Sequence, residues 1–156
     1  MLELKREFYL NLKKIENYKQ ICKLESLYYQ HGRTTVHKHS RNVAYFSLLL
    51  ARKLEKIFNI KFNYDNLIIG AFLHDLFLYD WHEKSNTHRL HGYRHPLTAS
   101  INAKKMCNVN NEVIKIIQSH MWPLTITKVP ISREAIIVCI VDKIMAIIET
   151  FENIKV

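Results

Sequence analysis

A histidine and an aspartate stand side by side in a stretch of the sequence that is otherwise apolar. Between Leu67 and Leu78 the only ionisable side chains are those of His74 and Asp75. Burying an unpaired carboxylate is costly, and a protein usually neutralises it or pairs it with a cation. The two residues could form a purely structural pair, with the imidazole donating to the carboxylate, or they could face a metal ion.

A second aspartate has a similar setting. Asp142 stands in the segment AIIVCIVDKIMAIIE, where every neighbour from Ala135 to Ile148 except Lys143 is apolar. The adjacent position on a helix points about 100° away, so Lys143 is poorly placed to neutralise Asp142. Two carboxylates in apolar helices therefore need a cation or a full set of hydrogen-bond donors.

Several of the nine histidines also lie beside apolar helical stripes. His120 follows Ile116 and Ile117, and His39 heads a stripe at spacings of three and four, formed by Val43, Phe46, Leu50 and Leu54. A single histidine in such a place is commonly a hydrogen-bonded core residue, but several together indicate metal ligands. Neutral imidazoles and carboxylates without a thiolate suit iron or manganese, with cobalt, nickel or zinc as alternatives, better than a structural zinc site.

Helices are expected to position these side chains. Apolar residues recur at helical spacing along the chain, and three Gly and three Pro are too few to punctuate a many-stranded sheet. A length of 156 residues suits a single domain with a sizeable core. The pattern predicts an all-α fold with helices over residues 3–16, 17–30, 37–58, 64–79, 97–107, 110–121 and 132–152.

Turn and cap signals separate the predicted helices. The expected caps and breaks are Gly32, Thr34 or Thr35, Asn63 or Asp65, and Pro96 in the first turn of a helix. The longest predicted loop covers residues 80–96, DWHEKSNTHRLHGYRHP, and holds four His, two Arg and one Lys. A polar loop of this length inside a compact domain is often functional, although it could also be a solvated crossover. A second irregular connector covers residues 123–130.

Composition narrows the class of protein. The formal net charge of +9 suits an anionic partner such as a phosphate compound or a nucleic acid, but the Lys and Arg residues are scattered and form no long basic run. The apolar stretches are too short for a membrane span, and the first residues contain no signal-peptide core. Three widely spaced cysteines, Cys22, Cys107 and Cys139, read as reduced thiols of a cytoplasmic protein.

The order of these residues resembles a known signature. His39, the pair His74-Asp75 in FLHDLFL, and Asp142 in IIVCIVDKI are similar to the H…HD…D motif of the HD superfamily of metal-dependent phosphohydrolases. The resemblance covers roughly residues 35–150. It implies a single-domain HD-type bundle of about six to seven helices, with residues 31–156 as the HD domain and residues 1–30 as an N-terminal helical extension packed on the core.

Two more histidines extend the resemblance to the binuclear members. His95 in HGYRHPLTAS and His120 in IIQSHMWPL match the pattern H…HD…H…H…D, and this part of the chain is similar to the bacterial dinucleoside-tetraphosphate hydrolases. The resemblance implies two metal ions. One would be held by His39, His74 and Asp142, the other by His95 and His120, and Asp75 would bridge them.

The chain also departs from related patterns. Many HD enzymes carry a Lys four positions after the His of the HD pair, where this chain has Leu78. The GYP element of cyclic-dinucleotide phosphodiesterases is absent, because HGYRHP only partly matches it. These departures argue against cyclic di-GMP as the substrate and leave a dinucleoside tetraphosphate as one candidate.

The resemblance implies hydrolysis of a phosphoester or phosphoanhydride bond in a small, anionic, nucleotide-like substrate by a metal-activated water. Basic residues would stabilise the phosphoryl charge. The candidate catalytic residues are Asp75, Arg94, His91 and Lys143. Candidates of second rank are His82, His88 and Arg89. Asp80 could orient a ligand or donate a proton, and Trp81, Tyr93 and Trp122 could stack on a base or simply pack in the core.

Two other functions use the same sequence features. Some binuclear HD proteins are mixed-valence di-iron oxygenases, and ligand identity alone does not separate them from hydrolases. A small basic helical protein could instead bind nucleic acid or another partner without catalysis, with its buried polar residues as core hydrogen-bond networks. The N-terminal segment FYLNLKKIENY could also form a homodimer contact.

Overall fold

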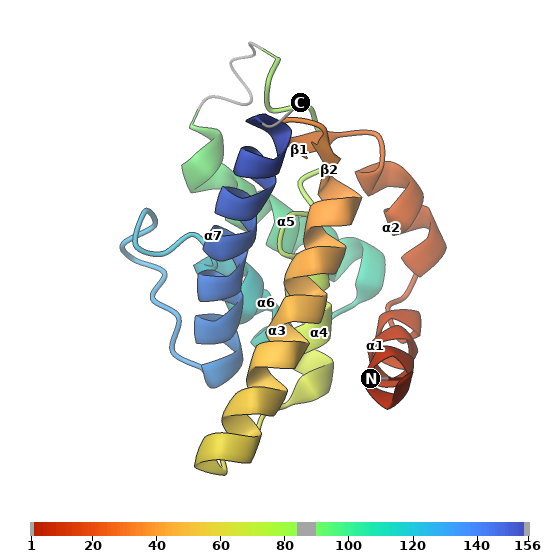
Figure 1. Cartoon of the computed structure of the whole chain (residues 1–156). Coiled ribbons are helices and arrows are strands. Elements are labelled where there is room, and N and C mark those ends of the chain that lie inside the picture. Colours follow the sequence, from red (N-terminus) through yellow and green to blue (C-terminus); the bar gives the residue numbers. More distant parts are fainter. Residues whose placement is uncertain (1, 84–89, 155–156) are drawn as a thin grey trace.

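The computed structural model describes residues 2–83 and 90–154 of the chain, and it confirms the all-α fold (Figure 1). The helices in this part of the chain are α1 (Leu2–Lys13), α2 (Tyr18–Glu25), α3 (Val36–Phe58), α4 (Tyr64–Leu73), α5 (His91–Cys107), α6 (Asn111–Ser119) and α7 (Arg133–Ile154). A short antiparallel hairpin of β1 (Tyr29–His31) and β2 (Thr34–Thr35) connects α2 to α3.

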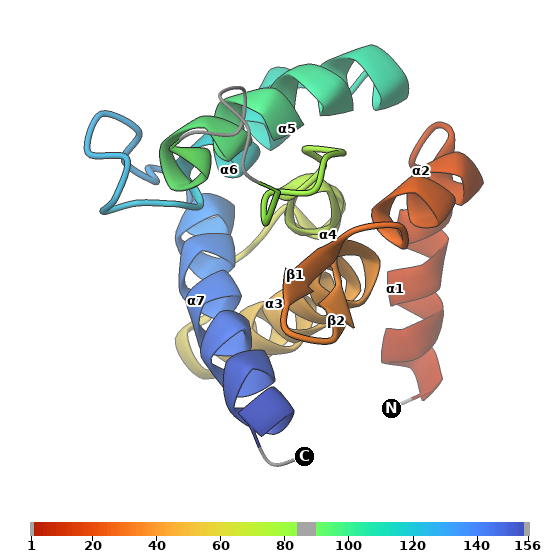
Figure 2. The same cartoon turned by 90° about the horizontal axis from the view of Figure 1, so that it is seen from above.

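Helix α4 lies in the middle of the bundle, and the other helices surround it (Figure 2). From Leu67 to Leu73 its sequence is apolar on all sides, which is typical of a buried helix. The side chains of Leu67, Ile68, Ala71, Phe72 and Leu73 are completely buried. A Cβ atom on Gly70 would lie 2.8 Å from Cγ2 of Ile116, so α4 and α6 approach this closely only because residue 70 has no side chain.

Helices α3 and α7 run side by side in opposite directions (Figure 1). Thr35 caps α3 by accepting a hydrogen bond from the backbone N–H of Lys38 at 3.2 Å, and Asn63 caps α4 through the N–H of Asn66 at 3.0 Å. Both caps are among the predicted ones. They set the first residue of each of the two helices that lead to His39 and His74.

The apolar stripe predicted along α3 is buried only in part. Val43 is buried, but Phe46 is 46% exposed. Ser40 and Ser47 occupy the buried positions instead. Small side chains allow the neighbouring helices to approach α3, and the spacing of apolar residues does not reveal this preference.

Two predicted helices are shorter than expected. The helix expected over 17–30 ends at Glu25, because Tyr29–His31 pairs with Thr34–Thr35 through a turn in which Gly32 has a φ of 56°. The helix expected over 64–79 ends at Leu73. Beyond it the chain turns, and Leu78 adopts a φ of 59° that no continuing helix allows.

Helix α5 begins earlier than predicted. It starts at His91 rather than at residue 97, so Pro96 lies inside the helix and not in its first turn. Pro96 has no N–H and cannot donate the helical hydrogen bond to the carbonyl of Gly92. As a consequence His91 and His95 lie one turn apart on the same helix, and residues 91–96, which were expected in a loop, belong to α5.

All three cysteines are free thiols, with Cys107 and Cys139 buried and Cys22 half-buried. Within the described residues, no helix has both the length and the apolar character that crossing a bilayer would require.

Candidate metal centre

Six side chains from five helical segments converge in the interior of the bundle. One residue comes from α3, two follow the end of α4, one lies on α5, one follows α6 and one lies on α7. Each is at most 7% exposed, and together they are the six predicted ligands His39, His74, Asp75, His95, His120 and Asp142.

Asp75 lies between two pairs of histidines. Its Oδ2 atom is 3.3 Å from Nε2 of His74 and 3.7 Å from Nε2 of His39. Its Oδ1 atom is 3.3 Å from Nε2 of His95 and 3.7 Å from Nε2 of His120. Each oxygen of this single carboxylate therefore faces a different pair of imidazoles.

Asp142 completes the first of these groups. Its Oδ1 atom is 3.1 Å from Nε2 of His39 and 3.4 Å from Nε2 of His74. The ligand atoms of His39, His74 and Asp142 all lie within 4.8 Å of one another, and so do those of His74, Asp75 and His120. Both groups have the ligand types and the spacing that could hold a metal ion.

In each of the four converging histidines, the ring nitrogen that points away from the centre, Nδ1, lies within hydrogen-bond distance of an acceptor. Nδ1 of His74 donates to the carbonyl of Ala71 at 2.7 Å, and Nδ1 of His120 donates to the carbonyl of Ile117 at 2.7 Å. These two histidines follow the ends of α4 and α6 and bind a carbonyl three residues back, so the same local geometry recurs in both helices.

His95 and His39 follow the same rule with different acceptors. Nδ1 of His95 lies 3.0 Å from the carbonyl of His91, and Nδ1 of His39 lies 2.8 Å from Oε2 of Glu149. A carbonyl or carboxylate can only accept, so each Nδ1 carries the proton. In the neutral imidazoles this leaves the lone pair of Nε2 pointing into the centre, which is the tautomer that binds a metal.

Several polar atoms at the centre are not satisfied by ordinary hydrogen bonds within the protein. Nε2 of His74 and Oδ1 of Asp75 are buried without a hydrogen-bond partner. Nε2 of His95 and Nε2 of His120 lie only 2.8 Å apart, although both rings donate through Nδ1. Two facing lone pairs repel each other unless a proton or a cation lies between them. The donor set thus fits bound cations.

The pKa shifts of the buried side chains also fit a bound cation. Burial alone would raise the pKa of Asp75 and Asp142, but neighbouring imidazoles hold both values well below the usual range, His74 foremost at Asp75 and His39 at Asp142. Although burial opposes it, hydrogen bonds to Asp142 and Glu149 raise the pKa of His39 to about 9. Protons on imidazoles thus balance the buried carboxylates, and a divalent cation can take over this role.

The opposite shift occurs at His120. Burial lowers its pKa to about 3, and the nearby imidazoles of His74 and His95 act in the same direction. The imidazole of His120 is therefore neutral at physiological pH. Imidazoles that bind metal ions must be neutral, so this shift favours metal binding.

Two residues that support the ligands were not predicted. Glu149 is 1% exposed, and its Oε1 atom accepts a hydrogen bond from Nδ2 of Asn42 at 3.0 Å while Oε2 accepts from His39. Gln30 on β1 donates from Nε2 to Oδ2 of Asp75 at 2.6 Å. The sequence contains a hint of Glu149, because it lies two turns after Asp142 in the same apolar helix. Gln30 has no such signal.

A cavity of about 680 Å³ opens onto the centre. Besides four of the six converging residues, its wall includes Gln30, His91 and Lys143 together with apolar side chains such as Trp81, Met121 and Leu124. This volume lies within the usual range for sites that bind small molecules. The cavity can therefore admit a small organic ligand to the centre.

Among the predicted basic residues, Lys143 and His91 line this cavity. Nζ of Lys143 donates to the carbonyls of His120 at 2.8 Å and Cys139 at 3.1 Å, so the ammonium also holds the turn that carries His120. The ring of His91 is stacked between those of Trp81 and His95, at centroid distances of 5.1 and 4.5 Å.

Other predicted residues do not line the cavity. Arg94 is exposed on α5, and Asp80 accepts hydrogen bonds from the backbone and side chain of His82. Tyr93 and Trp122 are 54% and 40% exposed and lie away from the cavity wall. The remaining candidates, His88 and Arg89, lie outside the described residues.

Comparison with known proteins agrees with this arrangement. A family model described as "HD domain" matches residues 36–147, which include all six converging residues but neither Gln30 nor Glu149. A search of curated proteins found no significant match, and neither did a search of solved structures.

Proposed function

Because this chain belongs to the HD domain family, most of whose members are hydrolases, we propose that it is a metal-dependent phosphohydrolase with two metal ions in its centre. The observation that carries the proposal is the position of Asp75, whose two oxygens face two separate histidine pairs. One ion would be held by His39, His74 and Asp142, and the other by His95 and His120. Asp75 would bridge them.

Metal ions bound in this centre would supply Lewis acidity, which lowers the pKa of a water nucleophile and polarises phosphoryl oxygens. Asp75 spans both ligand groups and reduces the repulsion between two cations. The four imidazoles bind as neutral ligands, so only Asp75 and Asp142 bring negative charge. The loaded centre therefore keeps a positive charge that attracts an anionic phosphate.

The cavity supports a small, nucleotide-like substrate. Lys143 adds positive charge to its wall, and the imidazole of His91 lies beside the ligand His95, where it can exchange a proton with a leaving group. The ring of Trp81, which also lines the cavity, offers a surface for a base. A dinucleoside tetraphosphate is one candidate, with cleavage at a phosphoanhydride bond.

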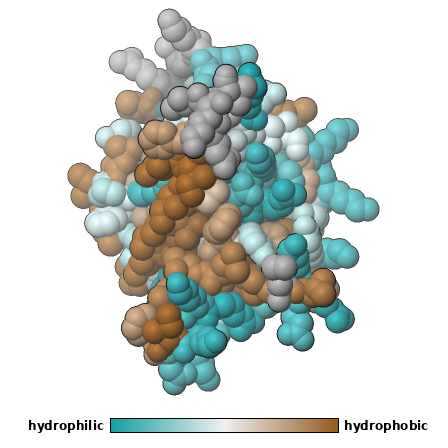
Figure 3. Space-filling view, viewed as in Figure 1, coloured by the Kyte–Doolittle hydropathy of each residue, from teal (hydrophilic) through white to brown (hydrophobic). Residues whose placement is uncertain are grey.

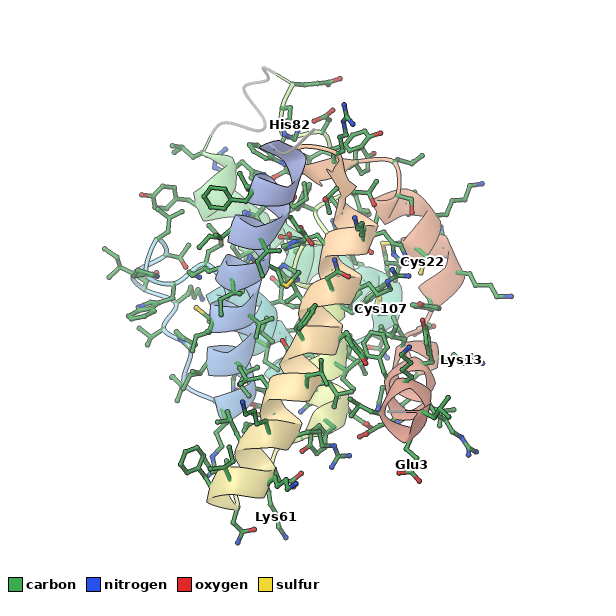
Figure 4. All side chains as sticks on the ribbon, in the orientation of Figure 1. Glu3, Lys13, Cys22, Lys61, His82 and Cys107 are labelled. Atoms are coloured by element: carbon green, nitrogen blue, oxygen red, sulfur yellow. The ribbon has the colours of Figure 1, made fainter. Side chains whose placement is uncertain are left out.

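The absence of a thiolate from the donor set favours iron or manganese, with cobalt, nickel and zinc as further candidates. The first test is the metal-to-protein ratio of chain purified without a chelator or a metal-binding tag. We expect about two metal ions per chain, in line with a two-ion site. The variants His95→Ala and Asp75→Asn should each lower this ratio, and His82→Ala should not, because His82 is exposed and donates to Asp80 at the end of the bundle (Figure 4).

A phosphate-release screen over nucleotides then tests the reaction. Activity that requires the metal and disappears in His95→Ala supports the proposal. Failure to bind any metal, even after loading with iron or manganese, refutes it. Because di-iron oxygenases of this superfamily share the same ligand types, oxygen consumption by the iron-loaded chain without phosphate release would replace hydrolysis by oxygenation. Salt-dependent nucleic-acid binding by a metal-free chain would favour the non-catalytic alternative.

A further inference from the structure

Helix α7 has two faces of very different character. One face carries Asp142 and Glu149 toward the metal centre. On the opposite face, every exposed residue from Ile136 to Ile148 is an isoleucine. These residues, which we call the isoleucine face, are Ile136, Ile140, Ile144, Ile147 and Ile148, each 42–58% exposed.

The isoleucine face forms a continuous band on the surface of the molecule, visible as the brown column over α7 in Figure 3. Two aromatic side chains extend it. Phe151 is 62% exposed on the next turn of α7. Phe46 is 46% exposed on α3, one turn after Asn42, whose side chain binds Glu149 of α7.

The area of this band is close to what a stable dimer buries. If a large apolar side chain presents about 200 Å² when fully exposed, the exposed fractions of these seven side chains correspond to about 700 Å² of apolar surface. Monomeric proteins seldom expose a larger apolar patch, and a standard interface covers about 800 Å² on each partner. Polar residues around the band would supply the remaining area.

The spacing of the face suits a copy of itself. Ile136, Ile140, Ile144 and Ile148 follow one another at intervals of four residues, so the row is symmetric about a point between Ile140 and Ile144. A two-fold axis at that point would pack Ile140 of each copy against Ile144 of the other. Rows of this spacing interdigitate in the commonest class of helix packing.

Charge also favours a second copy over other partners. The chain has a net charge of +9, but the isoleucine face itself carries no charge. Lys143 lies among these residues in sequence, yet its ammonium donates to the carbonyls of His120 and Cys139. Two copies can therefore meet here without like charges in contact, whereas an acidic peptide or an anionic membrane would find no basic residue on the face.

From these observations we propose that the chain forms a homodimer through the isoleucine faces of two antiparallel α7 helices. The segment FYLNLKKIENY is a weaker candidate for this contact, because Phe8, Leu12 and Ile15 are buried in the core. The proposal does not depend on the metal centre or on its chemistry.

Sedimentation velocity tests the dimer. The wild-type chain should sediment as a dimer at micromolar concentration. In the double variant Ile140→Glu, Ile144→Glu, four carboxylates would meet at the axis, which should weaken association on the order of a hundredfold or more. Ile57→Glu is the matched control, because Ile57 is 58% exposed at the far end of α3, and this variant should remain dimeric. Circular dichroism and thermal unfolding establish that each variant is folded.

A cysteine pair tests the antiparallel arrangement. In a Cys22→Ser background, a mixture of the Ile140→Cys and Ile144→Cys chains should form disulfides between the two variants faster than either forms them alone. A wild-type chain that is monomeric at high concentration overturns the proposal, and so does a dimer that survives the double glutamate variant. Sedimentation of the monomeric chain with anionic lipid vesicles, lost in the double variant, would assign the face to a membrane and overturn it too.

Discussion

Glu149 provides the sharpest test of how the protein supports its proposed metal ligands. Its carboxylate accepts a hydrogen bond from Nδ1 of His39 at 2.8 Å and another from Asn42 at 3.0 Å, and it is 1% exposed. It does not line the cavity. Its expected role is to orient the ring of His39 and to make Nε2 more basic.

The size of the effect follows from the two hydrogen bonds. A bond to a charged group contributes about 1.5–3 kcal/mol, and a bond between neutral groups about 0.5–1.5 kcal/mol. Glu149→Gln can keep an acceptor for His39 but loses the charge, so it should cost about 1 kcal/mol, or roughly a fivefold loss of metal affinity. Glu149→Ala removes the acceptor of both hydrogen bonds and should weaken binding about 10–100-fold.

The assay is a chelator competition that resolves two binding steps. Only the binding step that we assign to His39, His74 and Asp142 should be weakened, and the step that we assign to His95 and His120 should keep its affinity. Glu112→Gln is the control, because it makes the same chemical change at an exposed glutamate on α6. Unchanged affinity in a folded Glu149→Ala chain, or equal weakening of both steps, would refute this role.

Three further predictions concern the stability of the metal-free chain, measured by urea unfolding. Gln30→Ala should lower the free energy of unfolding by about 1–2 kcal/mol, because Asp75 loses a buried donor at 2.6 Å; an unchanged value would mean that the bond contributes nothing. Gly70→Ala should cost about 1–3 kcal/mol, because the new Cβ would lie 2.8 Å from Cγ2 of Ile116; a neutral result would show that α6 can move aside. Burial raises the pKa of Glu25 to about 7, so the folded chain binds this proton more tightly than the unfolded one. Its contribution is complete below pH 4.5 and is lost as the pH rises through 7, and in Glu25→Gln this part of the pH dependence should disappear.

The types and apolar surroundings of five of the six proposed ligands could be predicted from the sequence, whereas His95 was found only through the resemblance to the binuclear HD proteins. His74, Asp75 and Asp142 are flanked by apolar residues at helical spacing, and such residues must be buried. A buried charge needs a partner, so their convergence in one place could be anticipated. The all-α fold and the caps at Thr35 and Asn63 could be predicted for the same reason, because they depend on residues close together in the chain.

Contacts between distant segments could not be predicted in this way. Gln30 reaches Asp75 only because a hairpin replaces the end of a predicted helix, and hairpin pairing competes with helix formation through residues outside the local pattern. The start of α5 at His91, which brings His91 beside His95, was missed because Pro96 is usually found in a first turn. Phe46 was placed in the core because apolar spacing does not show which side of a stripe faces a neighbouring helix.

The sequence by itself thus determined which residues must be buried and which chemistry they could perform, because helical periodicity and the cost of burying charge act locally. Only the tertiary structure decided which oxygen of Asp75 faces which histidines and which acceptor holds each Nδ1. It also showed that the five residues of the isoleucine face are turned away from the core. These features depend on the packing of helices that are far apart in the chain, and no periodic pattern within one helix specifies that packing.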